Sequence, residues 1–268
     1  MTGTASAIDS HLSIEPLAGS VGSVVTGIDL REIDDLTFAR LRRLFFERHV
    51  LVFPAQELSP NDHVEFARRW GPITVHPRVP PIEGHPEIIP VYDPSDPIAS
   101  TWHQDQTFLD DPPTTAFLVS RALPSAGGDT MFANQHRALA ELSPTMRDVL
   151  GGLNAVHRRV STDAHGAIVE SDRAVHPIVL RHPVTGQSAL FVNSDYTSGI
   201  DGMTPSESEP ILQHLYRHAV RPDFTCRVRW GLGDLVMWDN LSVMHCVVAD
   251  ATGDRLLHKV TVTGDSPS

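Results

Sequence analysis

A histidine and an aspartate two residues apart form the most informative pair in this sequence. His103 and Asp105 lie in segment 100–108, and on an extended strand their side chains would project from one face. One offers a neutral nitrogen donor and the other an anionic oxygen donor. These are two of the three ligands of a 2-His-1-carboxylate site for Fe(II). A surface histidine that shares a hydrogen bond with an aspartate would show the same spacing.

A second histidine is needed to complete such a site, and it must come from another strand. His245 lies shortly after the apolar run 234–238 and before a turn-like segment at 250–254. It is therefore the candidate for the third ligand.

Two cations occupy one face of the strand predicted at 255–262. Alternation places Arg255 and Lys259 on the same face as Leu257 and Thr261. Cations on a partly apolar face are costly to bury unless each meets an anion. The segment is therefore either an edge strand whose polar face contacts water, or a strand whose cations bind anionic groups.

The spacing of apolar residues predicts the helices that flank these segments. Ser59 can cap a helix and Pro60 suits its first position, which marks the start of one of them clearly. The proline-rich stretch 72–100 has no helical period and predicts a long ordered loop with short strands. The expected helices lie at 34–48, at 59–71, after 143–144 and at about 206–219.

Short β-like runs separated by turn residues dominate the chain from residue 101 onward. They favour a closed or double-sheet β architecture with flanking helices, which is a mainly β (α+β) fold. No linker divides the chain, so we expect a single domain over 1–268, with residues 1–10 disordered. The runs are at 115–120, 189–193, 226–230, 234–238 and 256–262.

Composition excludes several classes of function. The 268 residues include 33 acidic and 21 basic side chains, a net charge of −12, which disfavours nucleic acid and anionic membranes as partners. Two cysteines do not make a disulfide framework. The first residues lack a signal-peptide pattern, and no apolar run approaches the ~18 residues of a membrane span. We therefore expect a cytoplasmic protein.

Taken in order along the chain, these segments resemble the TauD/TfdA family, the Fe(II)- and 2-oxoglutarate-dependent oxygenases related to taurine dioxygenase. The resemblance spans roughly 12–265. It rests on the order and spacing of several motifs rather than on any one of them. These are Val75-His-Pro77, His103-x-Asp105, Gly127-Gly-Asp-Thr130, His182-Pro-Val-Thr-Gly186, Trp238-Asp-Asn with His245, and Arg255 with Lys259-Val-Thr-Val.

The family implies a double-stranded β-helix (jelly-roll) core and a site within it. By resemblance, His103, Asp105 and His245 are the iron ligands, and Thr130 and Arg255 bind 2-oxoglutarate. An arginine suits a buried dicarboxylate because its fork-shaped donor is always charged. The implied reaction uses O2, converts 2-oxoglutarate to succinate and CO2, and hydroxylates or otherwise oxidises a small-molecule substrate.

The resemblance also indicates which residues contact the substrate. His76 and Lys259 match family positions that meet an anionic group, and Tyr196 matches a pocket wall. Lys259 replaces an arginine, and Val79 and Ala99 replace a tyrosine and an asparagine that contact taurine. We therefore expect a small, anionic substrate other than taurine.

Three further expectations come from the same comparison. Segment 158–175 is short for the family's lid and is expected to be mobile. Relatives often form dimers or tetramers, so a homo-oligomer is expected. Two other functions stay open: an idle jelly-roll binding module, and a zinc hydrolase with the same ligands. The idle module is disfavoured because the metal-ligand positions, Arg255 and Thr130 are all present, and the zinc hydrolase because Arg255 and Thr130 would have no role in it.

Overall fold

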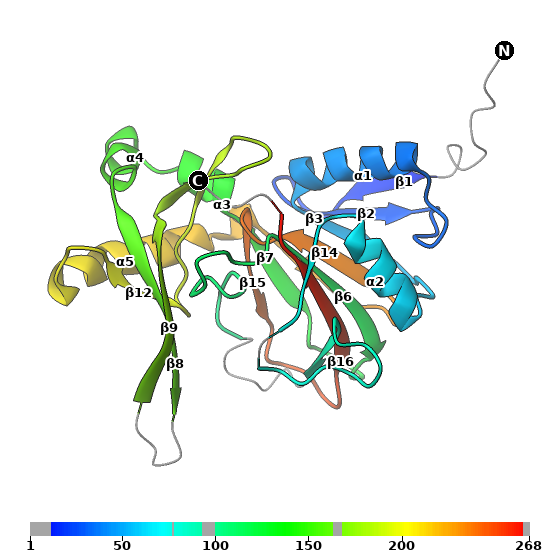
Figure 1. Ribbon diagram of the computed structural model, residues 1–268. Coiled ribbons are helices and arrows are strands. Elements are labelled where there is room, and N and C mark those ends of the chain that lie inside the picture. The colour runs from blue at the N-terminus through cyan, green and yellow to red at the C-terminus, as the bar shows by residue number, and fades with distance from the viewer. Residues whose placement is uncertain (1–11, 77, 93–99, 163–167, 265–268) are drawn as a thin grey trace.

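The computed structural model describes residues 12–76, 78–92, 100–162 and 168–264. The expected disorder at residues 1–10 lies outside this range. A large, almost entirely antiparallel sheet forms the centre of the molecule (Figure 1). Its strands follow one another in the order β1 (Ser13–Pro16), β2 (Ser23–Thr26), β3 (Val50–Phe53), β14 (Leu235–Asp239), β6 (Thr115–Ala122), β16 (Leu256–Val262) and β4 (Ile73–Thr74), and β5 (Ile89–Tyr92) also pairs with β16.

A smaller antiparallel sheet packs against the large one. It consists of β13 (Thr225–Val228), β7 (Thr130–Asn134) and β15 (Val243–Val247), with β7 in the middle. Side chains of both sheets share one buried cluster, in which the rings of Phe132 and Trp238 lie 5.6 Å apart. Two facing sheets of this kind form the jelly-roll core, which confirms the predicted fold.

Strand β14 shows why its sequence reads as a continuous apolar run. Val236 and Trp238 face the small sheet, whereas Leu235 and Met237 face the helices on the other side. Because both faces of the strand are buried, residues 235–238 are all apolar, and this part of the sequence shows no alternation of polar and apolar residues.

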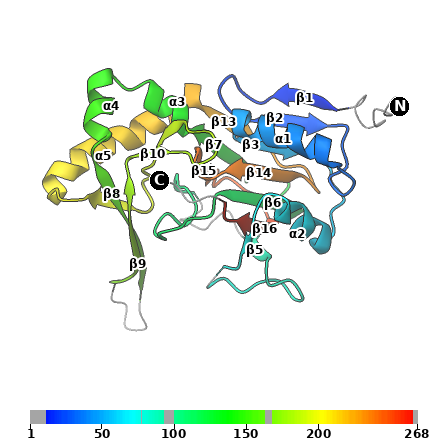
Figure 2. The same cartoon turned by 45° about the horizontal axis from the view of Figure 1, so that its top comes forward.

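Helices α1 (Asp35–Arg48) and α2 (Pro60–Arg68) cover the outer face of the large sheet (Figure 2). Asp34 caps α1 by accepting from the backbone N–H of Thr37, and a Ser59–Asp62 capping box begins α2. The two helices predicted in this region are confirmed.

Strand β16 has neighbours on both sides, β6 on one and β4 and β5 on the other. The alternative that it is an edge strand is therefore wrong. Arg255, which directly precedes it, is only 3% exposed. Of the two cations, Lys259 meets a carboxylate of the protein, that of Asp105, whereas buried Arg255 is left for an anionic ligand.

The remaining helices pack around a second buried cluster beside the small sheet. The helices expected after 143–144 and near 206–219 are α4 (Pro144–Leu150) and α5 (Pro205–Ala219). A short helix, α3 (Gln135–Ala140), was not predicted. This region also contains β10 (Val179–Arg181), β11 (Ser188–Leu190), β12 (Thr197–Ile200) and a 3-10 turn, η2 (Pro222–Phe224).

A two-stranded hairpin of β8 (Asn154–Thr162) and β9 (Ile168–Pro177) projects from the body (Figure 1). It includes most of the segment expected to act as a lid, of which residues 163–167 lie outside the described range. The base of β8 pairs with β12, so the hairpin is anchored at one end. Among the described residues, no helix is both long and apolar enough to cross a membrane.

Candidate metal centre

The three predicted metal ligands converge on one buried point. Nε2 of His103 and Nε2 of His245 each lie 3.9 Å from Oδ1 of Asp105. One ligand atom from each of the three residues lies within 4.8 Å of the others, and all three residues are 7% exposed. No other group of this kind occurs among the described residues.

Backbone pairing places the two histidines side by side. The N–H of His103 donates to the carbonyl of His245 at 3.0 Å, and the N–H of His245 donates back at 2.8 Å. His245 lies on β15, whereas His103 forms an isolated bridge just before a turn in which Gln106 has a φ of 54°. The expected strand at 103–105 is therefore reduced to one bridge, and the turn directs the carboxylate of Asp105 towards the imidazoles.

Asn240 fixes the loop that carries Asp105. Its side-chain oxygen accepts from the backbone N–H of Asp105 at 2.7 Å, and its Nδ2 donates to the carbonyls of Asp105 and Pro113 at 3.0 and 2.8 Å. The Trp238-Asp-Asn motif suggested a metal ligand downstream but not this contact. The Asn side chain joins the two segments that supply the ligands.

The protonation states suit a divalent metal. Nδ1 of His103 lies 2.7 Å from the carbonyl of Thr101 and must donate to it, which leaves the lone pair of Nε2 facing the centre. Burial, with a smaller contribution from His103, holds the pKa of His245 well below its ordinary value. Burial alone would raise the pKa of Asp105, but the charge of Lys259 holds it well below its ordinary value. Two neutral imidazoles and one carboxylate therefore fit Fe(II).

Lys259 contacts a metal ligand directly. Its Nζ lies 2.5 Å from Oδ2 of Asp105 and 5.4 Å from the centre of the Trp238 ring. The predicted role of Lys259 was to contact the substrate's anionic group. That role stays a prediction. In this structure the ammonium group pairs with Oδ2 of Asp105, whereas Oδ1 is the oxygen near the two histidines.

Arg255 and Thr130 lie together, as predicted. The Arg255 guanidinium is within 3.4 Å of the Thr130 hydroxyl, which also accepts from Nε1 of Trp230 at 3.0 Å. Burial lowers the pKa of Arg255 to about 10, so its side chain stays charged near neutrality. Its Nε has no hydrogen-bond partner, and Arg255 lines a pocket of about 490 Å³. Arg255 is therefore a buried cation with an unpaired hydrogen-bond donor, and the Thr130 hydroxyl beside it can donate. Together they fit the far carboxylate of 2-oxoglutarate.

Gly128 allows the chain to pass close to this arginine. Its φ of 73° lies in the left-handed region, and an added Cβ would lie 3.1 Å from Cδ of Arg255. The Gly-Gly-Asp-Thr motif therefore lets the chain turn closely past Arg255 and places Thr130 beside its guanidinium.

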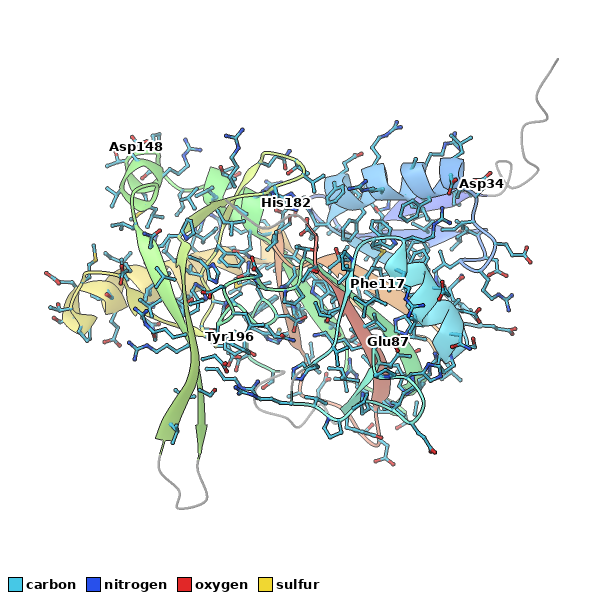
Figure 3. The ribbon with its side chains drawn as sticks, in the orientation of Figure 1. Asp34, Glu87, Phe117, Asp148, His182 and Tyr196 are labelled. Atoms are coloured by element: carbon cyan, nitrogen blue, oxygen red, sulfur yellow. The ribbon has the colours of Figure 1, made fainter. Side chains whose placement is uncertain are left out.

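Two further residues, Tyr196 and His76, were predicted to contact the substrate. Tyr196 packs against a metal ligand, and the charges of Lys259 and Asp105 act on His76. The ring of Tyr196, labelled in Figure 3, lies 6.2 Å from that of His103 and 5.0 Å from that of Phe108. The sequence did not reveal the contact with Phe108. Nδ1 of His76 accepts from the backbone N–H groups of Arg78 and Val79 at 3.2 and 2.9 Å. The ring proton of neutral His76 is therefore on Nε2, where it can be donated.

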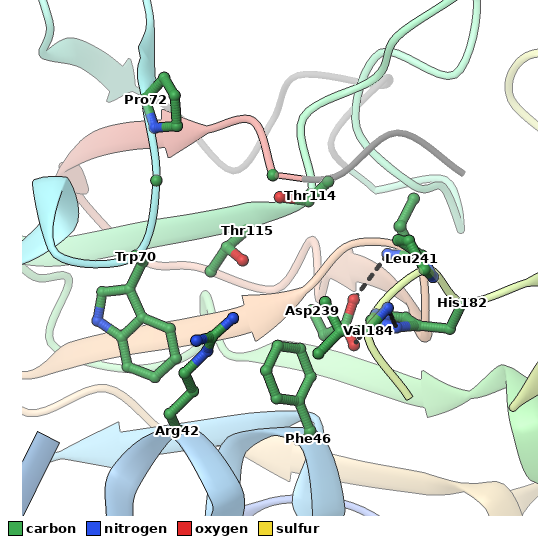
Figure 4. A pocket seen from close by; sticks show the side chains of 13 residues that line it. Arg42, Phe46, Trp70, Pro72, Thr114, Thr115, His182, Val184, Asp239 and Leu241 are labelled. Atoms are coloured by element: carbon green, nitrogen blue, oxygen red, sulfur yellow. Dashed lines mark hydrogen bonds and ion pairs between the residues drawn. The ribbon is translucent and has the colours of Figure 1, made fainter. Parts of the chain in front are cut away.

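A second pocket of about 340 Å³ lies apart from the three metal ligands (Figure 4). At its wall, Nε2 of His182 lies 3.0 Å from Oδ2 of buried Asp239, which also accepts from Ser242. Nδ1 of His182 accepts from the N–H groups of Val184 and Thr185. The His182-Pro-Val-Thr-Gly motif thus builds a turn that Asp239 anchors, which is a structural task.

Comparison with known proteins decides the family. A family model described as "Taurine catabolism dioxygenase TauD, TfdA family" matches residues 13–261. The chain belongs to the TauD/TfdA family. As a member of it, this protein is a non-haem iron dioxygenase that uses Fe(II), 2-oxoglutarate and O2. The His-Asp-His cluster and the Arg255–Thr130 pair fit these groups.

Individual TauD/TfdA relatives match over nearly the whole chain. The alpha-ketoglutarate-dependent dioxygenase cnsM of Penicillium expansum is 33% identical, over 96% of this chain and 78% of the relative. An alpha-ketoglutarate-dependent sulfate ester dioxygenase of Pseudomonas putida is 30% identical, over 96% and 91%. The crystal structure of a taurine dioxygenase from Burkholderia xenovorans has a TM-score of 0.86 at 32% identity, over 96% and 91%.

Proposed function

We propose that this protein hydroxylates, or otherwise oxidises, a small organic anion other than taurine. The observation that supports this proposal is the set of side chains around the His-Asp-His cluster. The positive charges of Lys259 and Arg159 act on His76. The aromatic ring of Tyr196 packs beside the metal ligand His103. Such a lining favours a molecule with an anionic group and an apolar body.

The residues of this chain would hold both bound groups. His103, Asp105 and His245 would bind the iron, and Arg255 with Thr130 would bind the far carboxylate of 2-oxoglutarate. Together with O2, the bound groups supply the oxidising equivalent, and succinate and CO2 are released. A zinc hydrolase with the same ligands would leave the buried Arg255 without an anion, so we do not favour it.

The protein's own contribution is positioning and the exclusion of water. Arg255 fixes one end of 2-oxoglutarate, and its guanidinium and the metal cluster define the two ends of that cosubstrate. The ring of Tyr196 covers one side of His103 and keeps bulk water from the ligands. Burial, with a smaller contribution from Asp195, raises the pKa of Tyr196, so its phenol stays neutral and does not repel an anionic substrate.

One relative supports a non-taurine substrate. The relative from Pseudomonas putida is named for sulfate esters, which are organic anions. In this chain Val79 stands where taurine dioxygenase has a tyrosine. The departure at Ala99 lies outside the described residues.

Three further properties belong to this proposal. The β8–β9 hairpin acts as the lid of the substrate pocket. The enzyme works in the cytoplasm, in keeping with its two unpaired, buried cysteines. It assembles as a homodimer or homotetramer, like many relatives.

A matched substrate screen tests the proposal. Purified enzyme with Fe(II), 2-oxoglutarate and O2 would be assayed for succinate release with alkyl sulfates, alkyl sulfonates, aryloxyacetates and taurine, each beside a neutral analogue. The proposal expects release above the substrate-free rate for at least one anion class, with taurine and the neutral analogues weaker. Equal or stronger release with the neutral analogues, or preference for taurine, would contradict it.

A further inference from the structure

The cations near the substrate side of the metal centre are not equivalent. Lys259 is held 2.5 Å from Asp105, so its charge is largely offset. Arg78 forms an ion pair with Asp172 at 2.6 Å. Arg159 forms no ion pair with any carboxylate of the described residues. It is therefore the cation whose charge is available to a ligand.

The strand β8 directs Arg159 towards the site. His157, two residues earlier and so on the same face, is fully buried and hydrogen-bonds the Thr107 hydroxyl at 2.9 Å. Arg159 continues this inward face, and its Cζ lies 5.4 Å from the centre of the Phe108 ring. Arg158 points to the opposite face and is exposed.

A chain of ring contacts leads from Arg159 to the metal ligands. Phe108, under the guanidinium, lies 5.0 Å from Tyr196, and Tyr196 lies 6.2 Å from His103. The charge of Arg159 also acts on His76. Burial lowers the pKa of His76, and the positive charges of Lys259 and Arg159 lower it further. His76 therefore stays neutral and contributes a hydrogen-bond donor rather than a charge.

An ion pair joins the two segments that carry Arg159 and His76. Arg159 is paired in register with Asp172 on β9. Asp172 binds Arg78, and Arg78 also donates to the Ser171 hydroxyl at 3.0 Å. Since Arg78 lies two residues from His76, this contact ties the hairpin to the His76 loop.

We propose that Arg159, rather than Lys259, binds the anionic group of the substrate, with Nε2–H of His76 as a second donor. This inference rests on the proposed function and names the residue that selects its substrate class. A guanidinium can donate two parallel hydrogen bonds to a carboxylate, sulfonate or sulfate. The apolar body of the substrate would then lie along Phe108 and Tyr196, towards the metal.

Equilibrium binding to the inert complex tests Arg159 without turnover. The enzyme would be loaded with Mn(II) and N-oxalylglycine, and calorimetry would give Kd for hexyl sulfate beside 1-hexanol and for phenoxyacetate beside phenoxyacetamide. Removing a charge-assisted hydrogen bond costs on the order of 10- to 100-fold in affinity. Arg159→Met should raise Kd for the anions by that factor. It should raise Kd for the neutral partners by less than about threefold, because methionine keeps the apolar stem.

Two variants complete the experiment. Arg159→Lys, which keeps the charge but loses the fork, should give an intermediate Kd, and Arg158→Met, on the opposite face, should leave Kd unchanged. Suppose that wild-type protein binds the anions more tightly than their neutral partners, and that Arg159→Met and Arg159→Lys each bind the anions with the same Kd as wild type. The inference is then wrong and the proposed function stands. If wild-type protein binds each anion no more tightly than its neutral partner at millimolar concentration, both the inference and the proposed function are wrong.

Discussion

Nζ of Lys259 lies 2.5 Å from Oδ2 of Asp105, while the other oxygen of this carboxylate, Oδ1, lies 3.9 Å from Nε2 of both His103 and His245. The two carboxylate oxygens of Asp105 thus have different roles. One is held by a lysine, and the other is left for the metal. The lysine orients a ligand from outside the coordination sphere.

Lys259→Met should therefore weaken metal binding. Loss of a contact that orients a metal ligand costs about 10- to 100-fold in affinity. Mn(II) titration followed by electron paramagnetic resonance measures the effect, with Lys259→Arg as the control that keeps the charge. Unchanged metal affinity, together with lost binding of hexyl sulfate, would instead support the role that the sequence suggested for Lys259.

Trp230 should influence the affinity for 2-oxoglutarate without touching the metal. Its Nε1–H occupies one lone pair of the Thr130 hydroxyl, which leaves the hydroxyl proton to donate elsewhere. Trp230→Phe and Thr130→Val should each raise KM for 2-oxoglutarate by about three- to tenfold, the effect of one neutral hydrogen bond. The affinity for Mn(II) should be unchanged. A KM equal to that of wild type in both variants would show that Thr130 does not contact the cosubstrate.

The ion pair between Arg78 and Asp172 should matter more for substrate binding than for stability. Its side chains are 38% and 26% exposed, so breaking it should cost less than about 1 kcal/mol of unfolding free energy. Asp172→Asn should raise KM for the substrate and speed hydrogen exchange at backbone amides of β8 and β9. Exchange and KM identical to those of wild type would argue against a lid held by this contact.

Buried neutral histidines should make the protein sensitive to acid. Burial lowers the pKa of His49 to about 4 and the pKa values of His63 and His157 to about 3. Between these values and about 6.5, the unfolded chain binds more protons than the folded one, so stability falls as pH drops through this window. Each such histidine contributes up to about 1.4 kcal/mol per pH unit.

Urea unfolding between pH 6 and 5 measures this slope. His63→Leu should reduce it by close to the contribution of one proton, whereas His214→Gln, on the exposed face of α5, should not change it. A slope unaffected by His63→Leu would mean that this histidine is already protonated in the folded state.

Local signals made much of the site predictable. His103 and Asp105 are close in sequence, and Arg255 and Thr130 belong to motifs with distinct spacing. The starts of α1 and α2 could be predicted because Asp34 and Ser59 cap them through contacts within one turn.

The features that the sequence did not reveal depend on contacts between distant segments. Lys259 meets Asp105 only because β16 lies beside the turn that follows His103. Strands β8 and β9 lack a clear alternation because the hairpin projects from the body, so polar residues such as Arg158 and Asp172 interrupt its apolar pattern. The position of Arg159 could therefore not be derived from spacing.

The anaerobic spectrum of the loaded enzyme tests whether His245 and Arg255 hold iron and 2-oxoglutarate in one site. Fe(II) and then 2-oxoglutarate would be added to metal-free protein, to His245→Ala and to Arg255→Met, with Arg217→Met, at the exposed end of α5, as an arginine control. We expect the visible metal-to-ligand charge-transfer band of the chelate in wild type and in Arg217→Met. We expect no band in His245→Ala, and a band in Arg255→Met only at far higher 2-oxoglutarate concentration. Wild-type protein that binds iron but gives no band, or a band that persists without His245, would contradict this assignment.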